Sequence, residues 1–203
     1  YTLPRLYQSL LKQDTSIFEW LIVDDGSTDN TQQLVDSWIK EGKLDIRYIY
    51  QQNSGKMQAH NRGVEECQTK LFLCCDSDDW LEDNSVKSAI DFWLAHTTGD
   101  KAKNLPPLCG MISPKKLINS KDPCTKISNN LRFTTLDGLY KLGYKGETAL
   151  MFITDVIKQH MFPKIEGEKF ITEKYVYNQL DRKYQFLFYP ECYNICEYQN
   201  DGY

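Results

Sequence analysis

Two acidic clusters stand directly after apolar stretches of the chain, and their side chains are the ones most able to do chemistry. The first is Asp24-Asp25, which follows the apolar residues 20–23 and precedes Gly26 and Ser27, where the chain can turn. A carboxylate there can accept hydrogen bonds from a nucleotide base or ribose, and it can equally cap the next helix. A phospho-receiver domain also has an acidic pair after a strand, but it needs a later acceptor Asp and a Lys within a shorter chain.

The second cluster places three carboxylates within four residues. Asp76, Asp78 and Asp79 follow the apolar residues 71–75. Like charges this close are unfavourable unless a cation neutralises them, and oxygen ligands suit Mg²⁺ or Mn²⁺. The pattern therefore predicts a divalent metal that also holds substrate phosphates; the alternative is an acidic turn in solvent. An EF-hand is excluded, because Leu81 stands where its loop needs glycine.

A polar loop between the two clusters supplies a glycine and a cation. Asn53, Gly55 and Lys56 in this loop are candidates for contact with a phosphate. The loop is not a P-loop, because Met57 stands where that motif needs Ser or Thr. On local evidence a lysine in solvent explains Lys56 equally well.

Three glutamates, Glu166, Glu168 and Glu173, lie around the start of a helix expected at residues 171–181. A carboxylate at a helix start usually serves the helix dipole or the cap. The residues alone therefore assign none of the three to catalysis.

The elements that must position these side chains alternate between helix and strand. In the first half, helices are expected at residues 3–12, 29–41, 57–67 and 85–96, and strands at 18–23, 46–50 and 71–75. This alternation predicts a parallel sheet with helices on both faces. Ligands bind beyond the carboxyl ends of the strands in such sheets, so both acidic clusters should share one rim.

The periodicity is less regular after residues 97–107, a polar, proline-bounded segment that is the best linker candidate. The strands expected there are residues 108–112, 148–153, 186–189 and 193–198, and the helices are 134–142 and 171–181.

Composition limits the class of protein. The 203 residues carry a net charge of −4, which argues against a general nucleic-acid binder. The chain is long enough for one domain with its own core. Its longest apolar runs fall far short of the roughly 20 residues that cross a bilayer. The seven cysteines lack zinc or disulfide-framework spacing, so reduced thiols and a cytoplasmic location are expected.

Three segments in series resemble the family 2 glycosyltransferases, which have the GT-A fold. FEWLIVDDGSTDNT (residues 18–31) is similar to the family's nucleotide-binding strand and turn. QQNSGKMQAHNRGV (residues 51–64) is similar to its Asn-x-Gly segment, and LFLCCDSDDWL (residues 71–81) to its metal-binding DxD strand. The resemblance covers residues 1–98 strongly and continues weakly through 167–180, which resembles the acceptor-side helix that carries the base.

The resemblance implies roles residue by residue. The nucleotide-binding set would be Asp24, Asp25, Asn53, Gly55, Lys56 and Asp76, and the metal set would be Asp76, Asp78 and Asp79. Glu173 falls at the position of the general base, where the family usually has Asp within a Glu-Asp pair. Because this sequence departs from that pair, Glu168 is the fallback.

The resemblance also implies an α/β GT-A domain with a mostly parallel central sheet. Residues 1–98 would form its nucleotide-sugar half, and residues 107–203 a mixed acceptor half. Family members begin with a strand that this sequence does not show, so the first strand of the sheet is expected to be absent.

The implied reaction is the inverting transfer of a sugar from a nucleoside diphosphate sugar, a UDP-sugar, to a hydroxyl group in polysaccharide or glycoconjugate biosynthesis. The acceptor would be a carbohydrate or a lipid-linked carbohydrate, and the cofactor Mn²⁺ or Mg²⁺. The expected location is the cytoplasm, with peripheral association at the inner face of the membrane as an open alternative. The rival hypothesis is a non-catalytic relative that binds a nucleotide or a glycan.

Overall fold

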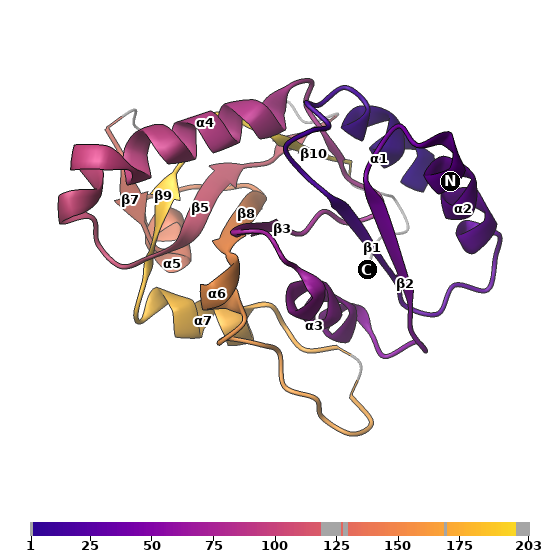
Figure 1. Ribbon diagram of the computed structural model, residues 1–203. Helices are drawn as coiled ribbons and strands as arrows, with labels where there is room; N and C mark the ends of the chain where they lie inside the picture. The colour runs from indigo at the N-terminus through magenta and orange to yellow at the C-terminus, as the bar shows by residue number, and fades with distance from the viewer. Residues whose placement is uncertain (1, 119–126, 128–129, 169, 198–203) are drawn as a thin grey trace.

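Helices and strands alternate along the first half of the chain, as expected. The computed structural model describes residues 2–118, 127, 130–168 and 170–197 (Figure 1). The first-half elements are α1 (Leu3–Leu10), β1 (Trp20–Asp24), α2 (Thr31–Glu41), β2 (Ile46–Tyr50), α3 (Lys56–Glu66), β3 (Leu71–Leu73), β4 (Trp80–Leu81) and α4 (Ser85–Thr97). Only the two-residue strand β4 has no counterpart among the expected elements.

The second half is richer in strands than expected. Its elements are β5 (Leu108–Pro114), β6 (Lys116–Leu117), β7 (Phe133–Thr134), α5 (Leu136–Lys141), β8 (Thr148–Ile153), α6 (Thr154–Ile157), α7 (Lys174–Asp181), β9 (Gln185–Phe188) and β10 (Asn194–Cys196). Three of these elements, β6, β7 and α6, were not expected, because they are too short to show a period in the sequence.

Glycines mark the end of α2 and the start of α3. Gly42 has a φ of 64°, and its N–H donates to the carbonyl groups of Ile39 and Trp38, which ends α2. Gly55 has a φ of 90° and directly precedes α3. The turn at Gly55 therefore fixes where Lys56, the first residue of α3, leaves the loop.

The sheet is divided into separate groups of strands. β1 and β2 form a parallel pair, and β4, β10 and β6 form a small sheet. The largest sheet has the order β3-β8-β5-β9-β7 and mixes parallel and antiparallel neighbours. The α/β class with flanking helices is as expected, and β3 differs from the expected parallel arrangement in pairing antiparallel with β8.

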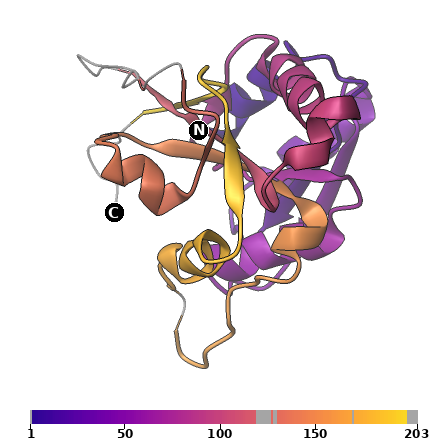
Figure 2. The ribbon, with the colours of Figure 1, turned by 90° about the vertical axis from the view of Figure 1, so that its left-hand side faces the viewer.

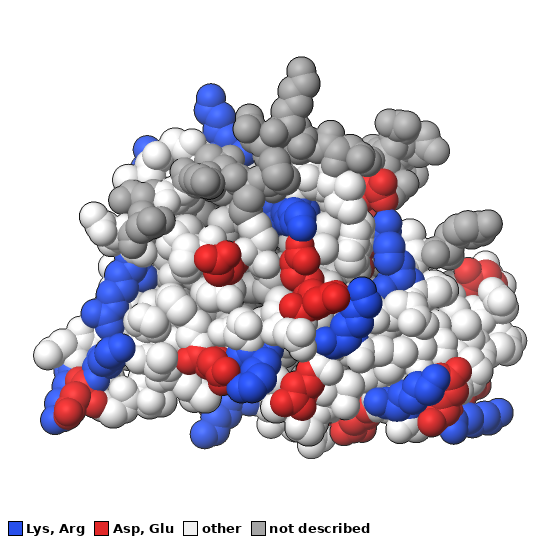
Figure 3. Space-filling model, turned by 90° about the horizontal axis from the view of Figure 1, so that it is seen from above, with Lys and Arg blue, Asp and Glu red and all other residues white. Residues whose placement is uncertain are grey.

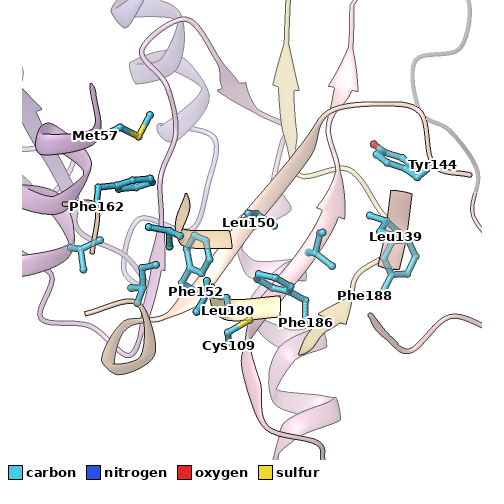
Figure 4. Close-up of a cluster of buried hydrophobic side chains, with 14 residues drawn as sticks. Met57, Cys109, Leu139, Tyr144, Leu150, Phe152, Phe162, Leu180, Phe186 and Phe188 are labelled. Carbon is cyan, nitrogen blue, oxygen red and sulfur yellow. The ribbon is translucent and has the colours of Figure 1, made fainter. Parts of the chain in front are cut away.

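Helices cover both faces of the largest sheet. Phe186 and Phe188 of β9 lie in a cluster with side chains of α3, α5, α6 and α7, whereas Leu187 between them clusters with Ala89 of α4. Successive strand side chains point to opposite faces, so α4 lies on one face and α7 on the other (Figures 1 and 2). Figure 4 shows the first cluster, in which the Phe152 and Phe186 rings lie 5.9 Å apart.

Strand β3 is less buried than its sequence predicts. Leu71, Phe72 and Leu73 are all partly exposed, and Cys74 is exposed. The apolar run of residues 71–75 indicates a buried strand, but among the described residues β3 pairs along one edge only, with β8. β1 likewise pairs only with β2, and most of its apolar side chains are partly exposed.

The segment at residues 97–107 is not an extended linker. It contains the end of α4 and a 3₁₀ helix at Gly99–Asn104. Pairing of β3 with β8 joins the first half of the chain to the second. Within the described residues, none of the helices combines the length and apolar character needed to cross a membrane.

The cysteines agree with the expectation only in part. Cys192 is disulfide-bonded, which contradicts the prediction of reduced thiols. A disulfide joins residues that meet only in the fold, so sequence spacing gave no sign of it. Among the described residues, the cysteines with free thiols are Cys67, Cys74, Cys75, Cys109 and Cys196.

Charged side chains of both signs are interspersed on the face shown in Figure 3. The described atoms of that face show no extended basic area. This agrees with the net charge of −4.

Candidate functional site

Asp24 shapes the turn that follows β1. It is 5% exposed and accepts hydrogen bonds from the Tyr48 hydroxyl at 2.5 Å and the Ser27 N–H at 2.7 Å. Burial alone would raise the pKa of this carboxyl, but the two donors outweigh burial and hold the pKa below its ordinary value. Both oxygens are engaged inside the protein, so a nucleotide contact from Asp24 stays a prediction.

Asp25 ties the end of β1 to the loop that follows β2. Its Oδ1 accepts from the Gln51 side-chain amide at 2.7 Å and the Ser54 N–H at 2.8 Å, and its Oδ2 accepts from the Gly55 N–H at 2.8 Å. An ionised carboxylate offers about four acceptor positions. Asp25 therefore organises the loop and keeps about one position for a ligand.

Gly26 makes room for the same loop. Its φ is +86°, and a Cβ at this position would lie 2.8 Å from the backbone nitrogen of Asn53. A side chain here would thus be strained and would push residue 53 away. The glycine serves the turn, as expected, and also allows two protein segments to approach closely.

Lys56 brings together two acids that are far apart in the sequence. Its Nζ lies 2.9 Å from Asp76 Oδ2 and 3.6 Å from Glu173 Oε1. Burial alone would lower the pKa of Lys56, but the Asp76 carboxylate outweighs burial and raises it. The structure therefore assembles a predicted phosphate-contacting lysine, a predicted DxD carboxylate and the predicted base at one point.

Asp79 forms the most buried ion pair of this cluster. Its Oδ2 lies 2.6 Å from Lys115 Nζ, and the two side chains are 7% and 16% exposed. Burial alone would lower the pKa of Lys115, but the Asp79 carboxylate raises it above its ordinary value. Asp79 is predicted as a metal ligand, yet the structure gives its carboxylate a protein cation as partner.

Asp78 is the member of the cluster with the most available carboxylate. Its side chain forms no ion pair with any described residue. Its carbonyl oxygen accepts a hydrogen bond from Arg5 at 2.6 Å, and the Arg5 guanidinium lies 3.7 Å from the centre of the Trp80 ring. These contacts hold the backbone of the cluster and leave the Asp78 carboxylate for a ligand.

The donor set does not form a closed metal site. No group of three or more His, Cys, Asp or Glu side chains could hold a metal ion among the described residues. Asp76 and Asp78 supply two carboxylates, which fits a divalent ion that takes its other ligands from substrate phosphates and water. The repulsion among the three carboxylates is thus also relieved without a metal, because Lys56 and Lys115 neutralise Asp76 and Asp79.

A cavity of about 710 Å³ opens beside Lys56, Asp76 and Glu173, which all line it. Glu168 is not among the lining residues; its Oε1 accepts from the Phe170 N–H at 2.9 Å. Of the two candidate bases, the geometry brings only Glu173 to the cavity.

His60 lines the same cavity. Its ring stands edge-on to Phe72 and Phe162, with 5.4 Å between the ring centres in each pair. Burial, helped by the nearby Lys56, lowers the pKa of His60 to about 4. The imidazole is therefore neutral at physiological pH.

Three residues of the site were not predicted from the sequence: Tyr48, Gln51 and Lys115. Gln51 adjoins the polar loop, and Tyr48 lies opposite Ile22 in the β1–β2 pair, so a correct strand register would have brought both close to Asp24-Asp25. Lys115 gives no local signal, because it meets Asp79 only through the fold.

The fold is that of known GT-A glycosyltransferases. The crystal structure of *Staphylococcus aureus* TarS 1–349 superposes with a TM-score of 0.74 at 20% identity, covering 97% of this chain and 56% of that chain. Mannosyltransferase PcManGT from *Pyrobaculum calidifontis*, solved with GDP-Man and Mn²⁺, superposes with a TM-score of 0.63 at 17% identity, covering 100% of this chain and 55% of that one. TarS 1–349 has also been solved in complex with UDP-GlcNAc.

The sequence comparisons identify the family. Residues 2–101 match the model of Glycosyl transferase family 2, and with the GT-A fold this means that the chain belongs to the family 2 glycosyltransferases. Teichoic acid poly(glycerol phosphate) polymerase of *Staphylococcus epidermidis* is 40% identical over 88 residues, which are 43% of this chain and 12% of the relative. The poly(ribitol-phosphate) beta-N-acetylglucosaminyltransferase TarS of *S. aureus* is 24% identical over 178 residues, which are 86% of this chain and 30% of the relative. The chain thus spans less than a third of either relative.

Proposed function

We propose that this protein transfers a sugar from a nucleoside diphosphate sugar to an acceptor hydroxyl, with inversion at the anomeric carbon. A single observation carries the proposal: Lys56 contacts both Asp76 and Glu173 at the edge of the 710 Å³ cavity. Phosphate-side and acceptor-side groups thus meet at one place. The UDP-GlcNAc complex of TarS supports a UDP-sugar as the donor.

The nucleotide would lie against the loop that Asp25 organises. Asp25 keeps about one acceptor position, which suits a single hydrogen bond from the base or ribose. Asn53 and Gly55 present the backbone of that loop, and Lys56 offers an ammonium group to the diphosphate. Asp24 supports the arrangement from beneath through Tyr48.

A divalent metal, Mn²⁺ or Mg²⁺, would be held by Asp76 and Asp78 together with the donor phosphates. It would supply positive charge next to the departing diphosphate. Manganese in the PcManGT complex supports this part of the proposal. Asp79 contributes indirectly, because its ion pair with Lys115 fixes the end of the cluster.

Glu173 is the proposed general base. Its carboxylate lies at the N-terminal end of α7, lines the cavity and is half exposed. From there it would take the proton of the acceptor hydroxyl while the hydroxyl oxygen attacks the anomeric carbon. The ammonium group of Lys56 lies 3.6 Å from this carboxylate and 2.9 Å from Asp76.

The proposed acceptor is a carbohydrate, free or lipid-linked, used in polysaccharide or glycoconjugate synthesis. The proposed location is the cytoplasm or the inner face of the membrane, where nucleotide sugars are available. Acceptor identity depends on loops, which vary on a shared scaffold.

Glu173→Gln and Glu168→Gln form a matched pair for the test. UDP release from UDP-GlcNAc would be measured with a panel of carbohydrate acceptors. Glu173→Gln should lower turnover by about 10²–10⁴-fold, the usual effect of losing a general base, and leave UDP affinity in Mn²⁺ nearly unchanged. Glu168→Gln should behave like wild type.

The opposite pattern would move the base to Glu168. If neither variant changes turnover, or if the wild-type protein binds UDP without ever releasing it from a donor, the catalytic proposal fails. The rival that remains is a non-catalytic nucleotide- or glycan-binding member of the family.

A further inference from the structure

The cavity beside Glu173 has a second end to which the proposed reaction assigns no residues. Lys56, Asp76 and Lys115 line the end where the donor phosphates would lie. The other end is lined from segments 136–140, 147–148 and 170–181, and we call it the α5–α7 end. The whole cavity measures about 710 Å³, within the range of about 300–1,000 Å³ that is usual for small-molecule sites.

Contacts between α5 and α7 fix the wall of the α5–α7 end. Asp181, the last residue of α7, accepts hydrogen bonds from the N–H groups of Leu136 and Asp137 at 3.0 and 2.8 Å. Leu139 of α5 and Leu180 of α7 are both 0% exposed and lie in one apolar cluster. Because two packed helices carry this wall, its shape exists before a ligand arrives.

Two aromatic side chains at this end are exposed. Tyr140 is 44% and Phe170 is 70% exposed, and both line the cavity. The Tyr140 hydroxyl donates to the carbonyl of Gly146 at 3.2 Å, and the Phe170 N–H donates to Glu168 at 2.9 Å. A pyranose ring has faces made of C–H groups, whose partly positive hydrogens suit the negative face of an aromatic ring. Exposed rings at the cavity therefore fit a sugar.

The Glu173 carboxylate lies near the tyrosines of this end. Burial raises the pKa of Tyr140, and the Glu147 and Glu173 carboxylates raise it further. Burial also raises the pKa of Tyr177, and Glu173 adds to that effect. A sugar that rests on Tyr140 would thus lie beside the proposed base.

Acidic side chains outnumber lysines at the α5–α7 end. Among the described residues that line it, the acids are Asp137, Glu147, Glu173 and Asp181, and the lysine is Lys174. The acids remain in excess when Lys141 is included, which pairs with Asp137. A phosphate or carboxylate group on an acceptor would meet like charges here. The hydroxyl groups of an uncharged sugar can instead donate hydrogen bonds to carboxylates.

We propose that the α5–α7 end binds the acceptor as an uncharged sugar that stacks on the exposed rings of Tyr140 and Phe170, and that the carboxylates of this end exclude a sugar carrying a phosphate or carboxylate. Because Lys56 and Lys115 line the donor end, charge would direct the two substrates to different ends of one cavity. The role of the bound sugar as acceptor rests on the proposed function, which leaves the charge of the acceptor open.

The test measures saccharide binding without a donor sugar. The probes are neutral di- and trisaccharides of glucose, galactose, mannose and N-acetylglucosamine, and the same saccharides with a phosphate on the terminal sugar. Affinities are measured by saturation-transfer NMR at millimolar saccharide, with the protein alone and with UDP and Mn²⁺. Wild type should bind a neutral saccharide roughly 10-fold or more tightly than its phosphorylated form. This difference should narrow at high salt, which screens the repulsion.

Substitutions of the two rings test the stacking. Tyr140→Ala and Phe170→Ala should each weaken binding of the neutral saccharide by roughly 3–10-fold, the usual value of one aromatic contact. Tyr140→Phe keeps the ring and should bind like wild type. Tyr175→Ala is the matched control, because Tyr175 of α7 is 47% exposed but is not among the lining residues, and it should also bind like wild type.

Glu147→Gln tests the exclusion of anions. Glutamine keeps the size and an acceptor oxygen but removes the charge. The variant should bind the phosphorylated saccharide more tightly than wild type does and bind the neutral one nearly as before. Glu166 is an exposed acid that is not among the lining residues, so Glu166→Gln should change neither affinity.

Three results would overturn the proposal. The first is that no neutral saccharide of the panel binds under either condition, and the second is that the phosphorylated forms bind more tightly. The third is that Tyr140→Ala and Phe170→Ala bind as well as Tyr175→Ala. If neutral saccharides bind as expected but no donor releases UDP, the glycosyltransferase proposal fails while the sugar site stands, so the two failures are distinct.

Discussion

Replacing Lys115 by methionine should destabilise the protein far more than the same change at its neighbour Lys116. Lys115 and Asp79 are 16% and 7% exposed, with 2.6 Å between the charged atoms. Methionine keeps the aliphatic part of the side chain but leaves the Asp79 carboxylate buried without its cation. Removal of one partner from a buried pair costs about 3–5 kcal/mol.

Lys116 is the matched control. It also forms an ion pair, with Glu82, but those two side chains are 45% and 34% exposed. Exposed pairs contribute about 0–1 kcal/mol, so Lys116→Met should stay within that range. Since domains are stable by roughly 5–15 kcal/mol, the two variants should be easy to distinguish by urea unfolding at pH 7.

The destabilisation in Lys115→Met should depend on pH. Without Lys115, the folded-state pKa of Asp79 should lie further above that of the unfolded chain, because burial and the nearby carboxylates of Asp76 and Asp78 all raise it and the cation that lowers it is gone. The unfolded state then loses its proton before the folded state does, so the penalty in Lys115→Met should shrink as the pH falls through the Asp79 pKa. A double variant, Lys115→Met with Asp79→Leu, should recover most of the loss.

Two results would refute this reasoning. One is a difference below about 1 kcal/mol between Lys115→Met and Lys116→Met, which would mean that the pair is solvated like a surface pair. The other is a penalty that does not change with pH, because a cost due to packing alone would not depend on the charge of Asp79.

Three further predictions concern the candidate site. Asp25→Ala removes three hydrogen bonds to the loop. It should weaken UDP binding by about 1–3 kcal/mol and speed amide hydrogen exchange at Ser54 and Gly55. Loss of affinity without faster exchange would mean that Asp25 contacts the ligand but does not organise the loop. Asp78→Asn should leave folding unchanged and weaken UDP binding in Mn²⁺ but not in EDTA, as titration calorimetry can show; equal affinities in all samples would contradict the metal proposal. His60→Gln should flatten the dependence of the unfolding free energy on pH between pH 6.5 and 4. The folded-state pKa of His60 is about 4, so the unfolded state takes up the proton first as the pH falls, and wild type loses up to about 3 kcal/mol of stability. Parallel profiles for both proteins would show that His60 titrates normally.

The sequence predicted helices and strands well wherever the apolar periodicity extended over enough residues to be recognised. β2 and β8 have the bounds that were expected, residues 46–50 and 148–153. The two-residue strands β4, β6 and β7 have no readable period. Antiparallel pairing of β3 with β8 joins residues about eighty positions apart, and no local pattern encodes such a register.

Residues of the candidate site were likewise predicted where the signal was local and missed where it was not. Asp24-Asp25 and the Asp76–Asp79 cluster were found because each follows an apolar strand, a signal within a few residues. Lys115 was missed because its importance comes only from Asp79, 36 positions away. The burial of β3 was overestimated, because an apolar run indicates a buried strand but does not show whether other elements cover it.

The two lysines indicate how an acidic cluster could serve the proposed diphosphate site. Asp76, Asp78 and Asp79 would repel phosphates if all three charges were unpaired. Lys115 neutralises Asp79 in a buried pair, whereas the Lys56–Asp76 pair is about half exposed. The Lys56 contact is therefore the one that a ligand can exchange. A diphosphate that draws Lys56 away from Asp76 would leave both Asp76 and Asp78 available to a cation and would keep the ammonium group near Glu173, so that donor, metal and base would become ordered together around one side chain.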